Sequence, residues 1–124
     1  MPPPGEASHA PLRIRSKVWV ERDGAVVISD YLAQLLAAVE THGSVAAAAQ
    51  SLDLPYATAW KKLRAMEAAA GAALLESDSG GVGGGATCLT PTAAEMLSAF
   101  RRVVAGLSDE VERRFNAARS RFDA

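Results

Sequence analysis

The segment from Ser44 to Gly71 limits the possible folds most, because it holds two helical patterns separated by a very short link. Ser44 is a favourable helix N-cap, and the residues after it, VAAAAQSL, are few and almost all alanine. Pro55 is tolerated in the first turn of a helix, and YATAWKKLRAMEAAA then runs to Gly71, which suits a left-handed stop. A short alanine-rich helix followed across a tight turn by a longer one predicts a helix-turn-helix.

Another helix is predicted before this pair, over about residues 30 to 42. Ser29 or Asp30 can cap its start, and Gly43 suits its end. The apolar residues between these ends recur at helical spacing, at Leu32, Leu35, Leu36 and Val39.

An N-terminal β-hairpin is predicted over residues 13–29, RIRSKVWVERDGAVVIS. Apolar and charged side chains alternate along its first half, and Asp23-Gly24 separates two β-branched runs, which is a strong hairpin signal. We expect residues 1–12 to be a disordered leader, because they show neither the basic nor the apolar stretch of a targeting peptide. No window is apolar enough to span a membrane, and the single Cys88 excludes an internal disulfide, so a cytoplasmic location is predicted.

The glycine-rich stretch DSGGVGGGATCLTP, residues 78–91, has two readings. Gly81, Gly83 and Ala86 fit the dinucleotide fingerprint G-x-G-x-x-G/A, but that loop must follow a strand and open a helix, whereas these glycines lead into TCLT. A P-loop is excluded, since no lysine follows the last glycine. The stretch is therefore predicted to be the tip of a second β-hairpin, a wing between the weak strands AALLES and TCLT.

The C-terminal part, residues 91–124, is predicted to be a helical dimerisation segment. Gly106 and Ser108 weaken its middle, so two helices are an alternative to one long helix. Packing within one chain is the alternative to a dimer seam. Apolar residues recur along it at steps of three and four, at Leu97, Phe100, Val104, Leu107, Val111, Phe115, Ala118 and Phe122.

Two segments, GSVAAAAQSLDLPYATAWKKLRAME and ALLESDSGGVGGGATCLTPTAAEML, resemble the N-terminal domain of ModE-type molybdate-responsive regulators and, more distantly, LysR-type regulators. The most specific elements are Ala59-Trp60, the glycine-rich stretch and the Leu89-Thr90-Pro91 that follows it. The resemblance implies a mainly α fold with small β: a winged helix-turn-helix with an N-terminal β-hairpin and a long C-terminal dimerisation helix. The winged helix-turn-helix would cover residues 13–90.

The sequence also departs from the ModE pattern. The molybdate-binding Mop domains of that family have no counterpart in it, so the resemblance does not extend to oxyanion sensing. The family's wing has an arginine at the position of Ser77 and a lysine at that of Val82, whereas this wing carries Glu76 and Asp78 and no basic residue.

The resemblance implies a DNA-binding transcriptional regulator that reads an inverted-repeat operator as a homodimer. The helix that begins near Pro55 would be the recognition helix, with a buried face of Tyr56, Ala59, Leu63, Met66 and Ala70. Its other face would meet bases and phosphates, assisted by Ser44 and by backbone N–H groups of the wing. The DNA-binding residues predicted are Ser44, Ala57, Thr58, Lys61, Lys62, Arg64, Gly83 and Gly84. Arg15 and Lys17 are further candidates for contacts at the flanks of the site.

Two alternatives stay open. The wing is acidic and Ala57 stands where the family commonly has a basic or polar residue, which favours a protein-interaction module that has lost DNA binding. The glycine-rich tip is compatible with a sensor of an oxyanion such as molybdate or tungstate. A separate protein is a candidate partner that would supply the sensor.

No enzyme activity, cofactor or metal site is predicted. Asp109, Glu110 and Glu112 lie beside Arg113 and Arg114 in a pattern typical of a solvated helix surface. His9 and His42 are far apart and have no ligand-like spacing.

Overall fold

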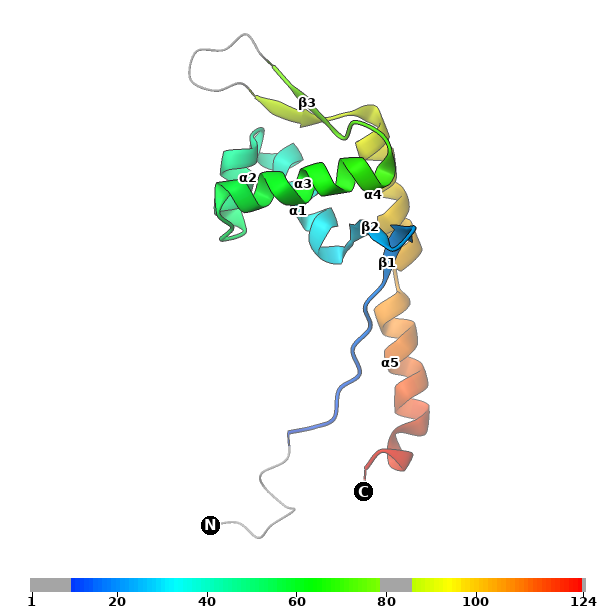
Figure 1. Cartoon of the computed structure of the whole chain (residues 1–124). Helices are drawn as coiled ribbons and strands as arrows, with labels where there is room; N and C mark the ends of the chain where they lie inside the picture. Colours follow the sequence, from blue (N-terminus) through cyan, green and yellow to red (C-terminus); the bar gives the residue numbers. More distant parts are fainter. Residues whose placement is uncertain (1–9, 79–85, 124) are drawn as a thin grey trace, which may run out of the picture. The chain divides into compact units, whose positions relative to one another are not determined.

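The computed structural model describes residues 10–78 and 86–123, and the chain divides into two compact units, Lys17–Val104 and residues 1–16 with 105–124. The smaller unit contains α5 (Leu107–Ala118) and η1 (Arg119–Arg121). The larger unit contains β1 (Trp19–Arg22), β2 (Ala25–Ser29), α1 (Asp30–His42), α2 (Val45–Ser51), α3 (Tyr56–Ala70), β3 (Leu75–Ser77), β4 (Thr87–Leu89) and α4 (Pro91–Val104) (Figure 1). This mainly helical architecture with small hairpins confirms the predicted fold class.

Helix α1 runs through the core of the larger unit, and its predicted bounds are confirmed. Ser29 Oγ accepts a hydrogen bond from the Leu32 N–H at 3.3 Å, which satisfies one of the free donors of the first turn. At the other end Gly43 adopts a left-handed φ of 77° and donates its N–H to Val39 O at 2.8 Å. The side chains that α1 turns inward are fully buried, among them Leu35, Leu36 and Val39.

Helices α2 and α3 form the predicted helix-turn-helix. Ser44 Oγ caps α2 by accepting from the Ala47 N–H at 3.1 Å, and Pro55 precedes the first residue of α3. Both helices contribute small side chains to the same core, Ala48 and Ala49 from α2 and Ala59 from α3.

The buried face of α3 differs from the predicted one at its ends. Tyr56 is 57% exposed, because it is the first residue of α3 and its ring packs along the helix in an edge-on contact with Trp60. Near the C-terminal end of α3, Ala69 is buried and Ala70 is only half-buried. The buried positions of this helix follow one another from Ala59 at steps of four, three and three residues, which leads to Ala69.

The hairpin of β1 and β2 is confirmed, but its strand starts later than predicted. Trp19 pairs with Ser29, and α1 begins at the next residue. Residues 13–18 therefore have no strand opposite them, and they lie outside β1 despite their alternating pattern. The turn at Asp23-Gly24 has the positive φ angles, 50° and 81°, that this dipeptide favours.

The hairpin of β3 and β4 is antiparallel, with Leu75 opposite Leu89. The Thr87 N–H donates to Gly43 O at 2.8 Å, which ties the hairpin to the end of α1, and the Thr90 N–H donates to Leu74 O at 2.9 Å, which extends the pairing of the hairpin itself by one residue. The glycines predicted to form its tip lie within residues 79–85, outside the described residues, so the contacts predicted for Gly83 and Gly84 stay predictions.

Helix α4 packs in the larger unit through Ala93, Leu97 and Phe100, so that unit extends to Val104, beyond the boundary predicted after residue 90. Thr90 caps α4: its Oγ1 accepts from the Ala93 N–H at 3.1 Å and donates to Ala73 O at 2.8 Å. The C-terminal segment is two helices, because Gly106, with φ of 75°, separates α4 from α5.

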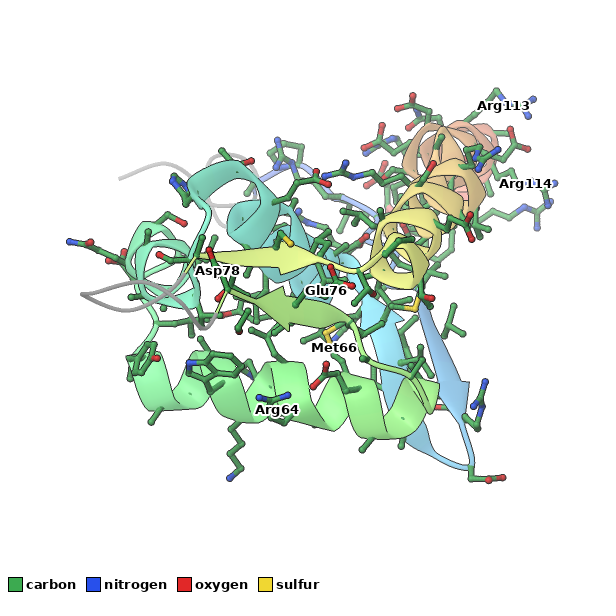
Figure 2. All side chains as sticks on the ribbon, turned by 90° about the horizontal axis from the view of Figure 1, so that it is seen from above. Arg64, Met66, Glu76, Asp78, Arg113 and Arg114 are labelled. Atoms are coloured by element: carbon green, nitrogen blue, oxygen red, sulfur yellow. The ribbon has the colours of Figure 1, made fainter. Side chains whose placement is uncertain are left out.

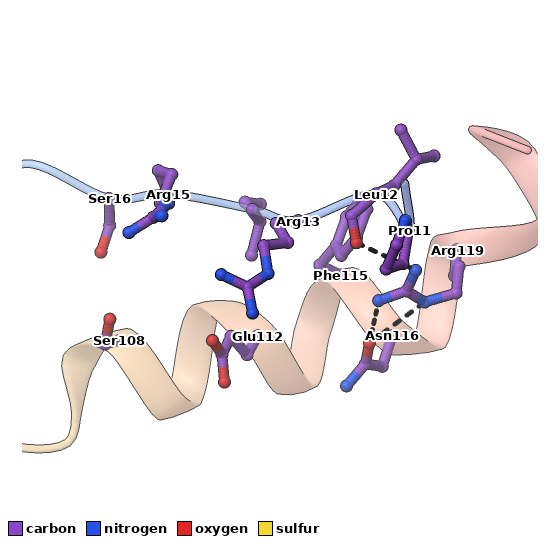
Figure 3. Close-up of a pocket in the computed structure, with 11 residues that line it drawn as sticks. Pro11, Leu12, Arg13, Arg15, Ser16, Ser108, Glu112, Phe115, Asn116 and Arg119 are labelled. Carbon is purple, nitrogen blue, oxygen red and sulfur yellow. Dashed lines mark hydrogen bonds between the residues drawn. The ribbon is translucent and has the colours of Figure 1, made fainter. Parts of the chain in front are cut away.

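In the smaller unit, the segment of residues 11–16 runs beside α5, and a groove of about 460 Å³ separates them (Figure 3). Phe115 is buried there and packs against Phe122 with ring centroids 5.2 Å apart. Arg119 Nη1 donates to Leu12 O at 3.2 Å. In the described part of the chain, no helix is both long and apolar enough to cross a membrane.

Candidate nucleic-acid interface

One side of α3 is exposed and carries cations without an exposed carboxylate. Its exposed positions after the first residue are Ala57, Lys61, Arg64, Ala65 and Ala68, and Thr58 and Lys62 are half-buried beside them. The single acidic residue of α3 is Glu67, whose side chain is 13% exposed. This surface is small and positively charged, which suits contact with a groove of duplex DNA.

The cations of α3 have different surroundings. Lys61 is exposed and makes no ion pair with the described residues. Lys62 Nζ lies 5.3 Å from the centroid of the Tyr31 ring on α1. The Arg64 guanidinium lies 4.8 Å from the Trp60 ring centroid, and Nη1 is 2.7 Å from Glu67 Oε1. Lys61 is therefore the most available of these cations, whereas Arg64 is held along the helix.

Glu67 connects α3 to the β3–β4 hairpin, a role that the sequence did not predict. Its Oε2 accepts from the Leu74 N–H at 2.9 Å and from the Leu75 N–H at 3.3 Å. Burial by itself would raise the pKa of Glu67, but the hydrogen bonds from Leu74, Arg64 and Leu75 outweigh it, so the pKa is lowered. The ionised carboxylate thus fixes the start of β3 against α3.

The described part of the β3–β4 hairpin is acidic on its exposed side. Glu76 and Asp78 are exposed on or just after β3 (Figure 2). Cys88 pairs with Glu76 across the hairpin, and its Sγ lies 4.0 Å from Glu76 Oε2. A phosphate would be repelled by these carboxylates, so the described strands of this hairpin are a poor phosphate-binding surface.

The predicted site residues of α2 and α3 lie in one compact unit, and the helix-turn-helix brings them together. Ser44 is half-buried, and its Oγ is engaged in capping α2, which leaves its hydroxyl hydrogen as the group that could reach a phosphate. Two exposed positions of α3, Ala65 and Ala68, are absent from the predicted DNA-binding residues, and Ala68 lies one turn after Arg64.

Comparison with curated proteins found relatives among molybdenum-related bacterial proteins. The chain is 35% identical over 91 residues to the molybdenum-pterin-binding protein MopB of Rhodobacter capsulatus, covering 73% of this chain and 33% of MopB. It is 39% identical over 69 residues to the molybdenum transport protein ModE of Herbaspirillum seropedicae, covering 56% of this chain and 26% of that protein. It is 34% identical over 76 residues to the transcriptional regulator ModE of Haemophilus influenzae, covering 61% and 30%. The chain thus spans about a third or less of the length of these relatives.

Among solved structures, the fold is similar to the crystal structure of a CbnR_DBD–DNA complex, with a TM-score of 0.55 and 28% identity. The match covers 69% of this chain and 93% of the other. Residues 32–94 match the family of bacterial regulatory helix-turn-helix proteins of the lysR type, and this range contains α2, the turn and α3. The chain carries the DNA-binding domain of a transcriptional regulator and belongs to the LysR family of bacterial regulatory helix-turn-helix proteins.

Proposed function

We propose that this DNA-binding regulator reads an inverted-repeat operator as a homodimer, with α3 of each protomer in a major groove. The observation that carries the proposal is the exposed face of α3, which presents Lys61 and small side chains and no exposed carboxylate. A helix of this kind can enter the major groove of B-DNA with its N-terminal half against the bases.

Each predicted residue has a role that fits its surroundings. Ala57 and Thr58, at the N-terminal end of α3, would contact thymine methyl groups. Lys61 would reach guanine acceptors, and Lys62 and Arg64 would contact phosphates at the edges of the groove. Ser44 would bind a phosphate at the start of α2, and Gly83 and Gly84 would do so from the tip of the wing.

The homodimer is supported by apolar side chains that the C-terminal helices leave in contact with water. On α4, Val103 is 65% exposed. On α5, Leu107 and Val111 are only half-buried along the stripe that the sequence predicted as a dimer seam. Pairing of such side chains between two protomers would remove them from water and hold two recognition helices in one assembly.

We also propose that the chain works in the cytoplasm by binding, without catalysis, and that a separate protein or a further part of the regulator supplies its signal. The surroundings of Glu110, one of the acidic residues that the sequence offers on α5, support binding over catalysis. Glu110 accepts hydrogen bonds from Arg113 and Arg114, which lower its pKa and keep it an ion-paired surface group.

Selection of bound sequences from a random duplex library tests the proposed function. The purified chain is expected to enrich an inverted repeat whose half-sites are about one helical turn, ~10 base pairs, apart. Selection should be made at about 0.15 M salt, where non-specific binding weakens. A single half-site would contradict the homodimer, and the absence of any enriched motif would contradict sequence-specific DNA binding and favour the protein-interaction alternative.

Calorimetry with sodium molybdate and sodium tungstate tests the sensor alternative. We expect neither oxyanion to release heat on mixing with the chain, because the described residues that flank the glycine-rich tip, Asp78 and Ala86, offer no cation to an anion. Sulfate at the same concentration is the control for non-specific anion binding. Saturable heat with molybdate and not with sulfate would establish an oxyanion site in this chain.

A further inference from the structure

A second candidate contact surface lies between the β1–β2 hairpin, the start of α1 and α3. It is an open groove of about 440 Å³, lined among others by Lys17, Trp19, Glu21, Tyr31 and Lys62. We call it the flank groove. The family match begins at residue 32, so most of this groove is built from residues outside the part of the chain shared with the LysR family.

The flank groove combines cations with exposed aromatic rings. Lys17 Nζ lies 5.8 Å from the centroid of the Trp19 ring, and Lys62 Nζ lies 5.3 Å from that of Tyr31. Trp19 is 46% exposed and Tyr31 is 39% exposed. Each ring holds a lysine near it by cation–π attraction while the charge stays accessible to solvent, which limits the conformational entropy that the lysines lose on binding.

Glu21 is the carboxylate that lines this groove. Its Oε2 accepts a hydrogen bond from Trp19 Nε1 at 2.9 Å, so it is attached to the indole edge. The two lysines leave an excess of one positive charge over Glu21 in the groove. The flank groove is thus weakly electropositive, in contrast to the acidic strands of the β3–β4 hairpin.

The flank groove and the β3–β4 hairpin lie on different sides of α3. Lys62 lines the groove, whereas Glu67 accepts hydrogen bonds from the start of β3. Five residues of α-helix correspond to a rotation of about 140° between these two side chains. Figure 1 likewise shows α3 between the two hairpins. Near the other end of α3, Arg22 Nη1 donates to Ala70 O at 3.1 Å, so the β1–β2 hairpin follows this side of the helix.

We propose that the flank groove binds the sugar-phosphate backbone of DNA beside the major groove that α3 occupies, on the side away from the β3–β4 hairpin. This inference rests on the proposed function, since it needs α3 in the major groove. A helix in that groove has a phosphate strand on each side. The β3–β4 hairpin presents Glu76 and Asp78 on its side of α3. Lys17 and Lys62 would therefore make the contact with the DNA phosphates, with the Tyr31 hydroxyl as a further hydrogen-bond donor.

The experiment measures affinity for two duplexes by fluorescence anisotropy over a range of salt concentrations. One duplex ends at the outer edge of the sequence that α3 reads, and the other continues by about 10 base pairs on each side. The variants are Lys17→Ala and Glu21→Gln, both at exposed positions, and Arg102→Ala on α4 is the matched control for loss of a positive charge.

On the long duplex, Lys17→Ala is expected to bind about fivefold more weakly per protomer at about 0.15 M salt, because one phosphate contact adds ~0.9 to the slope of log affinity against log salt. That slope should fall by about one per protomer. Glu21→Gln should bind more tightly than the wild type, and Arg102→Ala should match it. On the short duplex, Lys17→Ala and the wild type should bind equally.

Equal affinity and equal salt slope of Lys17→Ala and the wild type on the long duplex would overturn this inference while leaving the proposed function intact. A wild type that binds neither duplex would overturn the proposed function, and the inference with it. A loss for Lys17→Ala of the same size on both duplexes would also contradict the inference, since the contact would then not lie on the flanking backbone.

Discussion

Replacing Lys61 and Lys62 together with alanine is expected to weaken binding of the selected operator by about three orders of magnitude at about 0.15 M salt. Two protomers that each lose two cationic contacts would lose about four contacts, and each is worth about fivefold at that salt concentration. The slope of log affinity against log salt should become shallower by about 3.6. The loss should therefore shrink as the salt concentration is raised.

Fluorescence anisotropy with the operator duplex measures this loss. Arg101→Ala with Arg102→Ala is the matched control, because it removes the same charge from the exposed surface of α4 in the same compact unit. We expect the control to bind within a few-fold of the wild type. Similar losses for the two double variants would mean that overall charge governs binding and that α3 is not the contact surface.

The single variants separate the roles of the two lysines. Lys61 is exposed and free of ion pairs in the described part of the chain, whereas Lys62 is held beside Tyr31. Lys61→Ala should therefore change which base is preferred at one operator position, as expected for a residue that contacts a base. Lys62→Ala should weaken binding to all sequences about equally, as expected for a phosphate contact.

The helices of the larger unit could be predicted, because local signals in the sequence define where they begin and end. Ser29, Ser44 and Thr90 cap α1, α2 and α4, and Gly43 and Gly71 end α1 and α3 in left-handed conformations. Each of these signals acts within three or four residues of its partner, so it can be read along the chain.

Features that depend on distant partners could not be predicted in this way. The alternation over residues 13–18 is typical of a strand, but the strand needs a partner, and β2 ends at Ser29. The larger unit ends at Val104, because Leu97 and Phe100 pack in its core. The apolar pattern in the sequence alone does not show whether these side chains pack within the chain or against a second protomer. The placement of Lys62 beside Tyr31 joins residues on different helices.

The contact of Glu67 with the start of β3 also joins separate elements and could not be predicted from local signals. Its loss is expected to have a large effect on stability. Replacing Glu67 with alanine is expected to lower the free energy of unfolding by about 2–4 kcal/mol at pH 7. Leu74 is fully buried, and the N–H groups of Leu74 and Leu75 both donate to Glu67 Oε2, so the variant leaves two donors without their acceptor. Urea unfolding followed by circular dichroism measures the change, and Glu76→Ala, at an exposed position on β3, should differ from the wild type by less than about 0.5 kcal/mol.

The effect of Glu67 should depend on pH in a defined direction. Because the pKa of Glu67 is lower in the folded chain than the value of about 4.3 in an unfolded chain, folding favours the ionised carboxylate. Its contribution is therefore fully present above about pH 4.3 and is lost as the pH falls through the folded pKa. Glu67→Gln should be less stable than the wild type at pH 7, and the difference should shrink in titrations at about pH 3. A constant difference at both pH values would show that ionisation of the Glu67 carboxyl does not contribute to the contact between α3 and β3.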